Sequence, residues 1–299
     1  MEAKKILITG GAGFLGSHIA DELTRQGHMV TILDVRHSPY LQANQDMVIG
    51  DISDLSFLES VLAGFDIIYH LAALADLNES MNRPVDTAKV NILGTINLLE
   101  AARKNNIQRF IFGSTVYVYS REGSFYRCSK QACENFIEEF ESRFGLKYTI
   151  LRFGSLYGPR ADDSNGVYRL LKQFIEQSEV NYSGKSTDKR DYIHVYDAAR
   201  LSAQVLEPAY ENKHLLLTGH DKLTISELFT TFSEILNKTV SVRYLGDEGL
   251  GNGHYNITPY TYTPRVGKKL ITNEYVDMGQ GIIQVIEQIE QLKAMTTIN

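Results

Sequence analysis

The chain has few of the residues that stabilise small secreted domains or bind structural metals. Its 299 residues include two cysteines, six prolines and no tryptophan. Cys128 and Cys133 cannot form a multi-disulfide framework. The chain also has no CxxC pair and no HExxH pattern, which are common signatures of zinc sites. We therefore predict no metal site and a reducing environment.

An excess of positive charge and long apolar runs are also missing. Thirty Lys and Arg stand against 36 Asp and Glu, a formal net charge of −6, so we expect no nucleic-acid partner. The longest apolar stretches, such as residues 67–75, reach about half a membrane span, and His70 interrupts that one. An apolar strand begins directly after Met-Glu-Ala-Lys-Lys, which leaves no room for a signal peptide. We expect no membrane partner and a cytoplasmic location.

Short apolar runs alternate with amphipathic helices through the first half of the chain. Hydrophobic residues at 43% and charged residues at 22% fit an ordinary globular domain. We predict strands at residues 5–8, 30–33, 47–49, 66–71, 109–113 and 147–153, and helices at 14–26, 85–105 and 126–144. This alternation predicts an α/β fold with a doubly wound parallel Rossmann sheet.

The second half has looser patterning, with loops rich in Gly, Asp and Asn. We predict helices near 167–177 and 226–236 and short strands between them. These elements suggest a smaller C-terminal α/β lobe that binds substrate. The predicted division is a Rossmann domain of residues 1–154 and 189–213, and a substrate-binding lobe of residues 155–188 and 214–299.

A glycine-rich turn joins the first predicted strand to the first helix, in the segment Thr9-Gly10-Gly11-Ala12-Gly13-Phe14-Leu15-Gly16. Gly10 permits a tight turn, Gly13 lets the backbone approach a pyrophosphate, and Gly16 allows close packing of helix and strand. The second strand ends in Asp34, whose carboxylate can accept hydrogen bonds from adenosine ribose hydroxyls and repels a 2′-phosphate. This pattern predicts NAD rather than NADP as cofactor, and Arg36 is the one feature that weakens the preference.

Two further strand ends are candidate cofactor contacts. Asp51 and Ile52 follow the third strand, where a carboxylate and an apolar neighbour can hold the adenine ring. The small residues Leu71, Ala72 and Ala73 follow the fourth strand and permit close approach of a backbone to the cofactor.

Tyr126 and Lys130 lie four residues apart and therefore on one face of a helix. A tyrosine with a pKa of about 10 needs help to act as a base near neutrality. A neighbouring ammonium group and an oxidised nicotinamide both favour its phenolate form. Ser114 and Thr115 end the preceding strand, which strengthens the interpretation of this pair as catalytic.

With these motifs the sequence resembles the extended short-chain dehydrogenase/reductase family, in particular its nucleotide-sugar epimerases and dehydratases. The resemblance is densest over residues 6–197. Besides the glycine-rich turn and Tyr126/Lys130, it rests on these segments: His70-Leu-Ala-Ala73, Asn91-Ile-Leu-Gly-Thr-Ile-Asn-Leu-Leu-Glu-Ala-Ala102, Ser114-Thr115, Leu156-Tyr-Gly-Pro159 and Arg190-Asp-Tyr-Ile-His194.

The resemblance implies roles for individual residues. Tyr126 is the expected catalytic base and acid, Lys130 the residue that binds the nicotinamide ribose and lowers the tyrosine pKa, and Thr115 the hydrogen-bond partner of the reacting hydroxyl. Asn91 matches an asparagine at the nicotinamide site. Further roles are expected on the substrate side: Ser80 in a loop that contacts the sugar, and Arg190 as the arginine that grips the pyrophosphate.

The sequence departs from the family pattern in three places. Val116 and Tyr117 follow the catalytic threonine, where 4,6-dehydratases carry acidic residues, and the glutamate of the decarboxylase branch is also missing. Only residues 120–125 separate Tyr119 from Tyr126, a shorter loop than is usual. Ser155 stands where the family has a phosphate-contacting asparagine; we assign it to the substrate site. Arg265 is a poorly matched candidate for a second pyrophosphate arginine.

These observations predict an NAD-dependent nucleotide-sugar epimerase that acts at C4 through a transient 4-keto sugar. One alternative is an NAD(P)H-dependent reductase of NDP-4-keto-6-deoxy sugars. A more remote alternative is a non-catalytic dinucleotide-binding regulator. The family resemblance also implies a homodimer formed by the 85–105 and 126–144 helices. Apolar residues recur along both helices at helical spacing, namely Ile92, Ile96, Leu99, Phe136 and Phe140. Burial in the core of the monomer explains many of these positions equally well.

Overall fold

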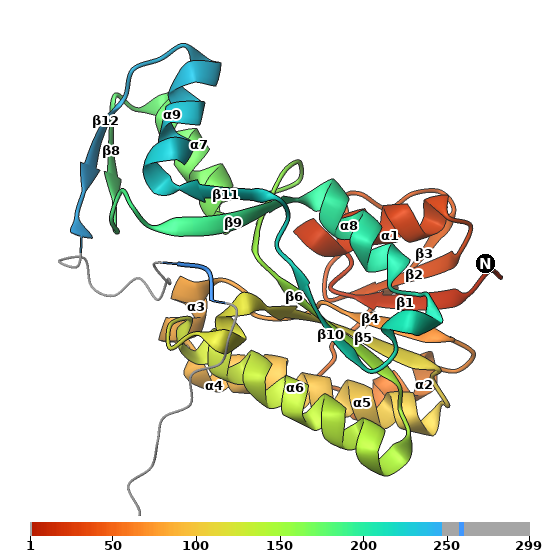
Figure 1. The fold of residues 1–299 in the computed structure, drawn as a ribbon. Coiled ribbons are helices and arrows are strands. Elements are labelled where there is room, and N and C mark those ends of the chain that lie inside the picture. The colour runs from red at the N-terminus through yellow and green to blue at the C-terminus, as the bar shows by residue number, and fades with distance from the viewer. Residues whose placement is uncertain (1, 247–256, 260–299) are drawn as a thin grey trace, which may run out of the picture. The chain divides into compact units, whose positions relative to one another are not determined.

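A parallel β-sheet organises the first part of the chain in the computed structural model, which describes residues 2–246 and 257–259. Within these residues the sheet has seven strands in the order β10-β6-β5-β4-β1-β2-β3, all parallel. The strands are β1 (Lys5–Thr9), β2 (Met29–Asp34), β3 (Gln45–Ile49), β4 (Ile67–His70), β5 (Arg109–Thr115), β6 (Tyr148–Phe153) and β10 (Lys213–Leu217). The structure thus confirms the predicted doubly wound α/β fold (Figure 1).

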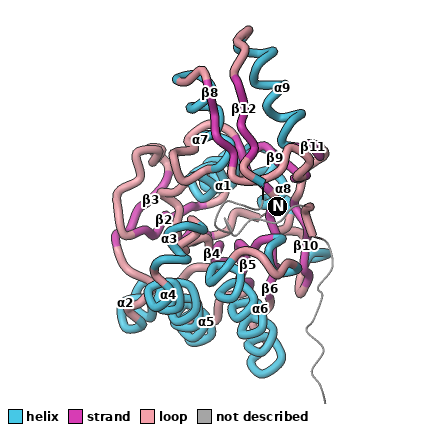
Figure 2. The backbone as a smooth tube through the Cα atoms, turned by 90° about the vertical axis from the view of Figure 1, so that its left-hand side faces the viewer, coloured by secondary structure: helices cyan, strands magenta, loops and turns pink. Residues whose placement is uncertain are grey.

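Helices cover both faces of this sheet. α1 (Phe14–Arg25) and α8 (Val195–Gln204) pack on one face, while α2 (Leu55–Val61), α5 (Gly94–Lys104) and α6 (Ser124–Phe144) pack on the other (Figures 1 and 2). Each face has its own buried apolar core, because the strands are apolar on both sides. None of the described helices is long and apolar enough to cross a membrane.

The helix predicted at 85–105 is not α-helical throughout but contains a π-helical segment. It runs as α4 (Pro84–Thr87), a π-helical segment η1 (Ala88–Leu93) and then α5. A π-turn admits one extra residue per hydrogen-bonded ring and rotates the side chains around it. Asn91 lies inside this segment and is almost fully buried.

In the part that the structure describes, the lobe contains small sheets and the two helices α7 and α9. A three-stranded sheet has the order β11-β9-β7, formed by Asp221–Thr224, Lys189–His194 and Ser155–Tyr157. β8 (Glu179–Tyr182) pairs with β12 (Ser241–Tyr244). α7 (Gly166–Glu176) and α9 (Ile225–Leu236) confirm the two predicted helices and share an apolar core rich in aromatic rings.

Strand pairing bears on the predicted domain division at two points. β9 lies in the predicted Rossmann domain and pairs with β7 and β11. β10 crosses the predicted boundary at residue 213 and pairs with β6 along its whole length. Short apolar runs do not reveal which sheet a strand joins, so the division stays a prediction. The part of the predicted lobe at 247–256 and 260–299, including Arg265, lies outside the described residues.

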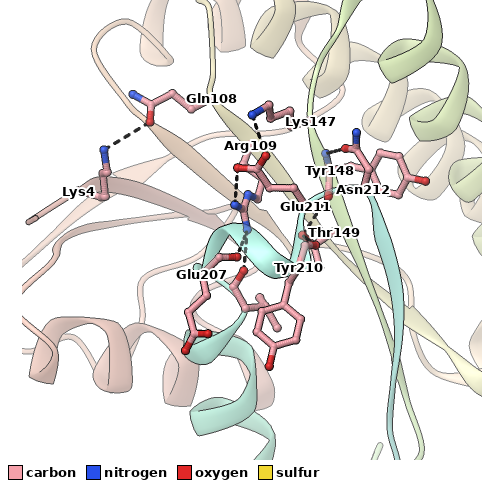
Figure 3. A network of polar contacts seen from close by, with 11 residues as sticks. Lys4, Gln108, Arg109, Lys147, Tyr148, Thr149, Glu207, Tyr210, Glu211 and Asn212 are labelled. Carbon is pink, nitrogen blue, oxygen red and sulfur yellow. Dashed lines mark hydrogen bonds and ion pairs between the residues drawn. The ribbon is translucent and has the colours of Figure 1, made fainter. Parts of the chain in front are cut away.

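A polar network anchors the amino end of β5 (Figure 3). The buried Arg109 guanidinium donates to the carbonyl of Val205 at 2.6 Å and to Glu211 Oε1 at 2.7 Å. Lys147 Nζ donates to the second oxygen of Glu211 at 2.7 Å. Since Glu211 precedes β10, these bonds fix the edge strand to the middle of the sheet. The opposite, carboxyl end of the sheet is left for the site.

Candidate active site

A cavity of about 1360 Å³ lies where the parallel strands end and the lobe begins. The carboxyl ends of β1, β2, β4, β5 and β6 all contribute to its wall, the usual ligand position in open α/β sheets. Most of the predicted site residues line it: Gly10, Gly13, Phe14, Leu15, Gly16, Asp34, Asp51, Ile52, Leu71, Ala72, Ala73, Thr115, Tyr126, Lys130, Ser155 and Arg190.

The glycine-rich turn is packed so tightly that side chains are excluded. Gly10 has φ +72°, and a Cβ there would lie 2.6 Å from the backbone nitrogen of Ala72. A Cβ on Gly16 would collide with the carbonyl oxygen of Gly10. Gly13 is the N-cap of α1 and makes no side-chain cap, and the first turn carries no acidic residue. The first amides of a helix favour an anion, so this turn suits a pyrophosphate.

Asp34 ends β2 beside this turn. Its Oδ2 accepts a hydrogen bond from the amide of Ala12 at 3.1 Å, which fixes the carboxylate toward the cavity wall. Arg36 and Asp162 line the same cavity, and Asp162 has a lowered pKa, chiefly because Ser164 donates a hydrogen bond to it, with a smaller contribution from Arg36. The first amides of α1 fit the pyrophosphate of NAD, and the Asp34 carboxylate fits its adenosine.

The two residues after β3 differ in exposure. The Asp51 carboxylate is exposed and accepts a hydrogen bond from the amide of Ser53 at 2.8 Å. Ile52 is buried, and a Cβ on Gly94 would lie 2.7 Å from its Cδ1. Ile52 therefore forms an apolar wall supported by the amino end of α5.

Tyr126 and Lys130 face the cavity from the first turns of α6. Lys130 Nζ donates to the carbonyl of Gly113 at 2.7 Å, and it lies 5.8 Å from the centre of the Tyr126 ring. Burial lowers the pKa of Lys130 to about 8, against the smaller raising effects of Cys133 and Glu134. Burial also raises the pKa of Tyr126. The phenol therefore needs nearby positive charge to ionise, and Lys130 is placed to supply it.

Thr115 is the last residue of β5 and is buried at the cavity wall. Its Oγ1 accepts a hydrogen bond from the amide of Tyr117 at 3.3 Å, which starts the 3₁₀ turn Val116–Tyr119. Val116 is fully buried, while Tyr117 lines the cavity with its ring 6.5 Å from that of Tyr126. An apolar and an aromatic side chain thus occupy the two positions after the threonine.

Two predicted residues do not line the cavity. The Asn91 side chain makes two hydrogen bonds with the backbone of Leu74. Its Oδ1 accepts from the amide at 2.8 Å, and its Nδ2 donates to the carbonyl at 3.1 Å. Nδ2 also donates to Ser129 Oγ at 2.9 Å, so Asn91 ties the loop after β4 to α6. Ser80 is fully buried, and its hydroxyl donates to the carbonyl of Leu77 at 3.0 Å. The side of the cavity near Ser80 is lined instead by Asn78, Glu79, Met81 and Asn82.

Arg190 and Ser155 reach the cavity from the lobe strands β9 and β7. Arg190 is buried, and its Nη2 donates to the hydroxyl of Tyr182 at 3.2 Å. A buried guanidinium at the cavity wall is suited to a phosphate oxygen. Sequence reasoning missed Tyr182 and the α7 residues Arg169 and Leu170, which also line the cavity. Only the lobe packing places them there, and no motif marks them.

The fold and this cavity define a dinucleotide-binding enzyme of the Rossmann class. Residues 6–217 match the model of the NAD-dependent epimerase/dehydratase family. A putative UDP-glucose 4-epimerase of Methanocaldococcus jannaschii is 30% identical over 246 residues, which cover 75% of this chain and 80% of the relative. A UDP-N-acetyl-α-D-glucosaminuronate decarboxylase of Bacillus cytotoxicus is 26% identical over 265 residues, with 80% and 82% covered.

Solved structures agree with the sequence relatives. A UDP-glucose 4-epimerase of Thermotoga maritima, solved with UDP-glucose, is 29% identical with a TM-score of 0.78, and the match covers 87% of this chain and 90% of that one. The chain therefore belongs to the NAD-dependent epimerase/dehydratase family. This confirms both the predicted family and the predicted cofactor, NAD.

Proposed function

We propose that the chain is an NAD-dependent nucleotide-sugar epimerase that inverts C4 of the sugar. The observation that carries the proposal is the convergence of Thr115, Tyr126 and Lys130 on one cavity that also contains the glycine-rich turn and Asp34. With NAD bound as the hydride acceptor, these groups would suffice for reversible oxidation of a sugar hydroxyl.

The residue roles follow from position and charge. The Tyr126 phenolate, stabilised by the Lys130 ammonium, removes the proton of the C4 hydroxyl, and Thr115 orients that hydroxyl. The glycine-rich turn and Asp34 would hold NAD, which would supply the acceptor and later the donor for the C4 hydride. The transient 4-keto sugar turns in the cavity between the two transfers, and Tyr126 then returns the proton. Proton transfer by a positioned side chain contributes about 10² to 10⁴-fold to such a rate.

Substrate anchoring is proposed for the lobe side of the cavity. Arg190 would grip the diphosphate as a planar fork, and Ser155 would contact a phosphate oxygen. For Ser80 we retain a role in shaping the sugar end through α3 (Leu77–Asn82), since its hydroxyl is engaged within that helix.

Epimerisation is favoured over decarboxylation or dehydration by the residues beside Thr115. Val116 and Tyr117 carry no carboxylate that could act as a second acid or base. Among the described carboxylates lining the cavity, Asp76 accepts a hydrogen bond from the amide of Glu79 as the cap of α3, and Glu79 pairs with Arg83. Both already have structural partners, within α3 for Asp76 and at its C-cap for Glu79.

A proton NMR time course tests the proposal, with catalytic NAD and a panel of UDP-, dTDP-, GDP- and CDP-sugars that includes uronic acids. We expect a C4 epimer without stoichiometric NADH. Release of carbon dioxide from a uronic acid would identify a decarboxylase. Consumption of NAD(P)H with a 4-keto sugar would identify a reductase, and no conversion by any route would support the regulator alternative.

A further inference from the structure

A buried carboxylate lies behind the Tyr126/Lys130 pair and has no part in the mechanism above. Glu134 follows Lys130 by one turn of α6 and is 6% exposed. Its Oε1 accepts a hydrogen bond from Ser114 Oγ at 2.5 Å, and also from Arg152 Nε at 3.1 Å. Its Oε2 accepts from Arg152 Nη2 at 2.5 Å. The carboxylate therefore has donors from two different strands.

The two donors are neighbours across the sheet. Ser114 of β5 and Arg152 of β6 are register partners, so Glu134 binds α6 to both strands at the level of the site. Lys130 Nζ binds the carbonyl of Gly113 at 2.7 Å. The last residues of β5 before Thr115 are thus attached to α6 by two consecutive turns of that helix.

Arg152 is itself held from two other elements. It donates to the hydroxyl of Tyr119, whose ring centre lies 4.7 Å from the guanidinium carbon. Its Nη2 is also 2.7 Å from His214 Nδ1 on β10. A buried carboxylate held by a fixed guanidinium has little freedom to move, because leaving either charge unpaired costs several kcal/mol.

We propose that Glu134 is a positioning residue, which sets the separation between Thr115 on β5 and the Tyr126/Lys130 pair on α6 through its hydrogen bond with Ser114. This inference rests on the proposed function, since it assigns Glu134 a part in that reaction. Glu134 is not among the residues that line the cavity, so its effect passes through β5.

The test compares Ser114→Ala, Glu134→Gln and the double variant in the epimerase assay, per NAD-loaded site. Ser114→Ala removes the bond to β5 but keeps the Glu134–Arg152 pair. A misplacement of about 1 Å can cost up to about 100-fold in rate. We expect kcat to fall by about 10-fold or more in each single variant, with KM unchanged and with little further loss in the double variant.

Two controls remove comparable groups far from the site. Ser202→Ala removes a buried hydroxyl that donates to the Ala198 carbonyl at 2.7 Å on α8. Glu211→Gln weakens a carboxylate pair with Arg109, which begins β5 at the opposite end of the strand. We expect kcat to be unchanged in both control variants, even where the substitution lowers the melting temperature.

The outcomes separate this inference from the proposed function. A wild-type chain that oxidises no nucleotide sugar would contradict the function, and the positioning role with it. An active wild type in which Ser114→Ala keeps the wild-type kcat would contradict the positioning role alone. Additive losses in the double variant would also contradict it, because they would mean that Glu134 acts by a route other than Ser114.

Discussion

At the level of a single residue, burial disfavours the positive charge of Lys130 on which its proposed role depends. Its charge is useful only beside Tyr126, yet burial there lowers its pKa from 10.5 to about 8. Between these two values the unfolded chain binds more protons than the folded chain, so the free energy of unfolding rises with pH in this window. The gain is at most about 3 kcal/mol.

We therefore predict that the stability of the wild type relative to Lys130→Met increases as pH rises from about 8 toward 10.5. Below pH 8 the difference should be constant, because the lysine is then charged in both states. Denaturant unfolding of both proteins across this pH range measures the difference in their free energies of unfolding. A difference in unfolding free energy that does not change above pH 8 would show that burial does not lower the pKa of Lys130.

Tyr126→Phe gives the second prediction at this scale. Phenylalanine fills the same space but cannot exchange a proton, so turnover should fall by about 10² to 10⁴-fold. NAD content, measured after denaturation of the purified protein, should match the wild type because the ring and α6 remain. Turnover at the wild-type rate would remove Tyr126 from the mechanism.

At the scale of elements, the turn between β1 and α1 depends on the loop after β4. Gly10→Ala would place a methyl group against the backbone of Leu71 and Ala72, in addition to the strain of φ +72°. We predict a lower melting temperature and weaker NAD binding by calorimetry. Gly27→Ala is the matched control, since Gly27 has φ +88° with no atom within 4 Å of a Cβ.

Gly27→Ala should cost about 1 kcal/mol from backbone strain alone and leave the dissociation constant for NAD unchanged. Equal effects of the two substitutions on NAD binding would mean that the contact between Gly10 and the β4 loop does not shape the site.

The same elements show which features of the site can be predicted from the sequence and which cannot. The strand–turn–helix around Gly10 and the Tyr126/Lys130 spacing depend on neighbours in sequence, so both could be predicted. The hydrogen bonds of Asn91 could not be predicted, because it lies in a π-helical segment and its partners, Leu74 and Ser129, are 17 and 38 residues away in sequence. Ser80 shows the same limit: its hydroxyl is used within α3, and only the tertiary structure reveals which α3 residues line the cavity.

At the scale of the whole molecule, η1 and α6 carry exposed apolar side chains. Phe136, a residue of the predicted dimer face, is 41% exposed, and Leu93 at the end of η1 is 47% exposed. Leu99, also a residue of the predicted face, is fully buried. The two elements are in contact, and apolar groups that gather in one exposed patch are typical of an interface. We predict a homodimer through this face.

Phe136→Asp should convert that dimer to a monomer in sedimentation equilibrium, because a carboxylate would be buried without a partner. Ile235→Asp, at a 78% exposed position of α9, should leave the assembly unchanged. A wild-type monomer, or a Phe136→Asp dimer as stable as the wild type, would contradict the prediction.

The position of β10 has a consequence for synthesis on the ribosome. This edge strand pairs with β6 but ends only at residue 217 of 299. A nascent chain that has emerged as far as β6 already holds six strands of the large sheet, yet the open edge of β6 has no partner until residues 155–212 have followed. Unpaired strand edges are templates for aggregation. The emerging polypeptide therefore carries an unprotected edge while much of the lobe is being translated, and a chaperone that covers β6 would act in that interval.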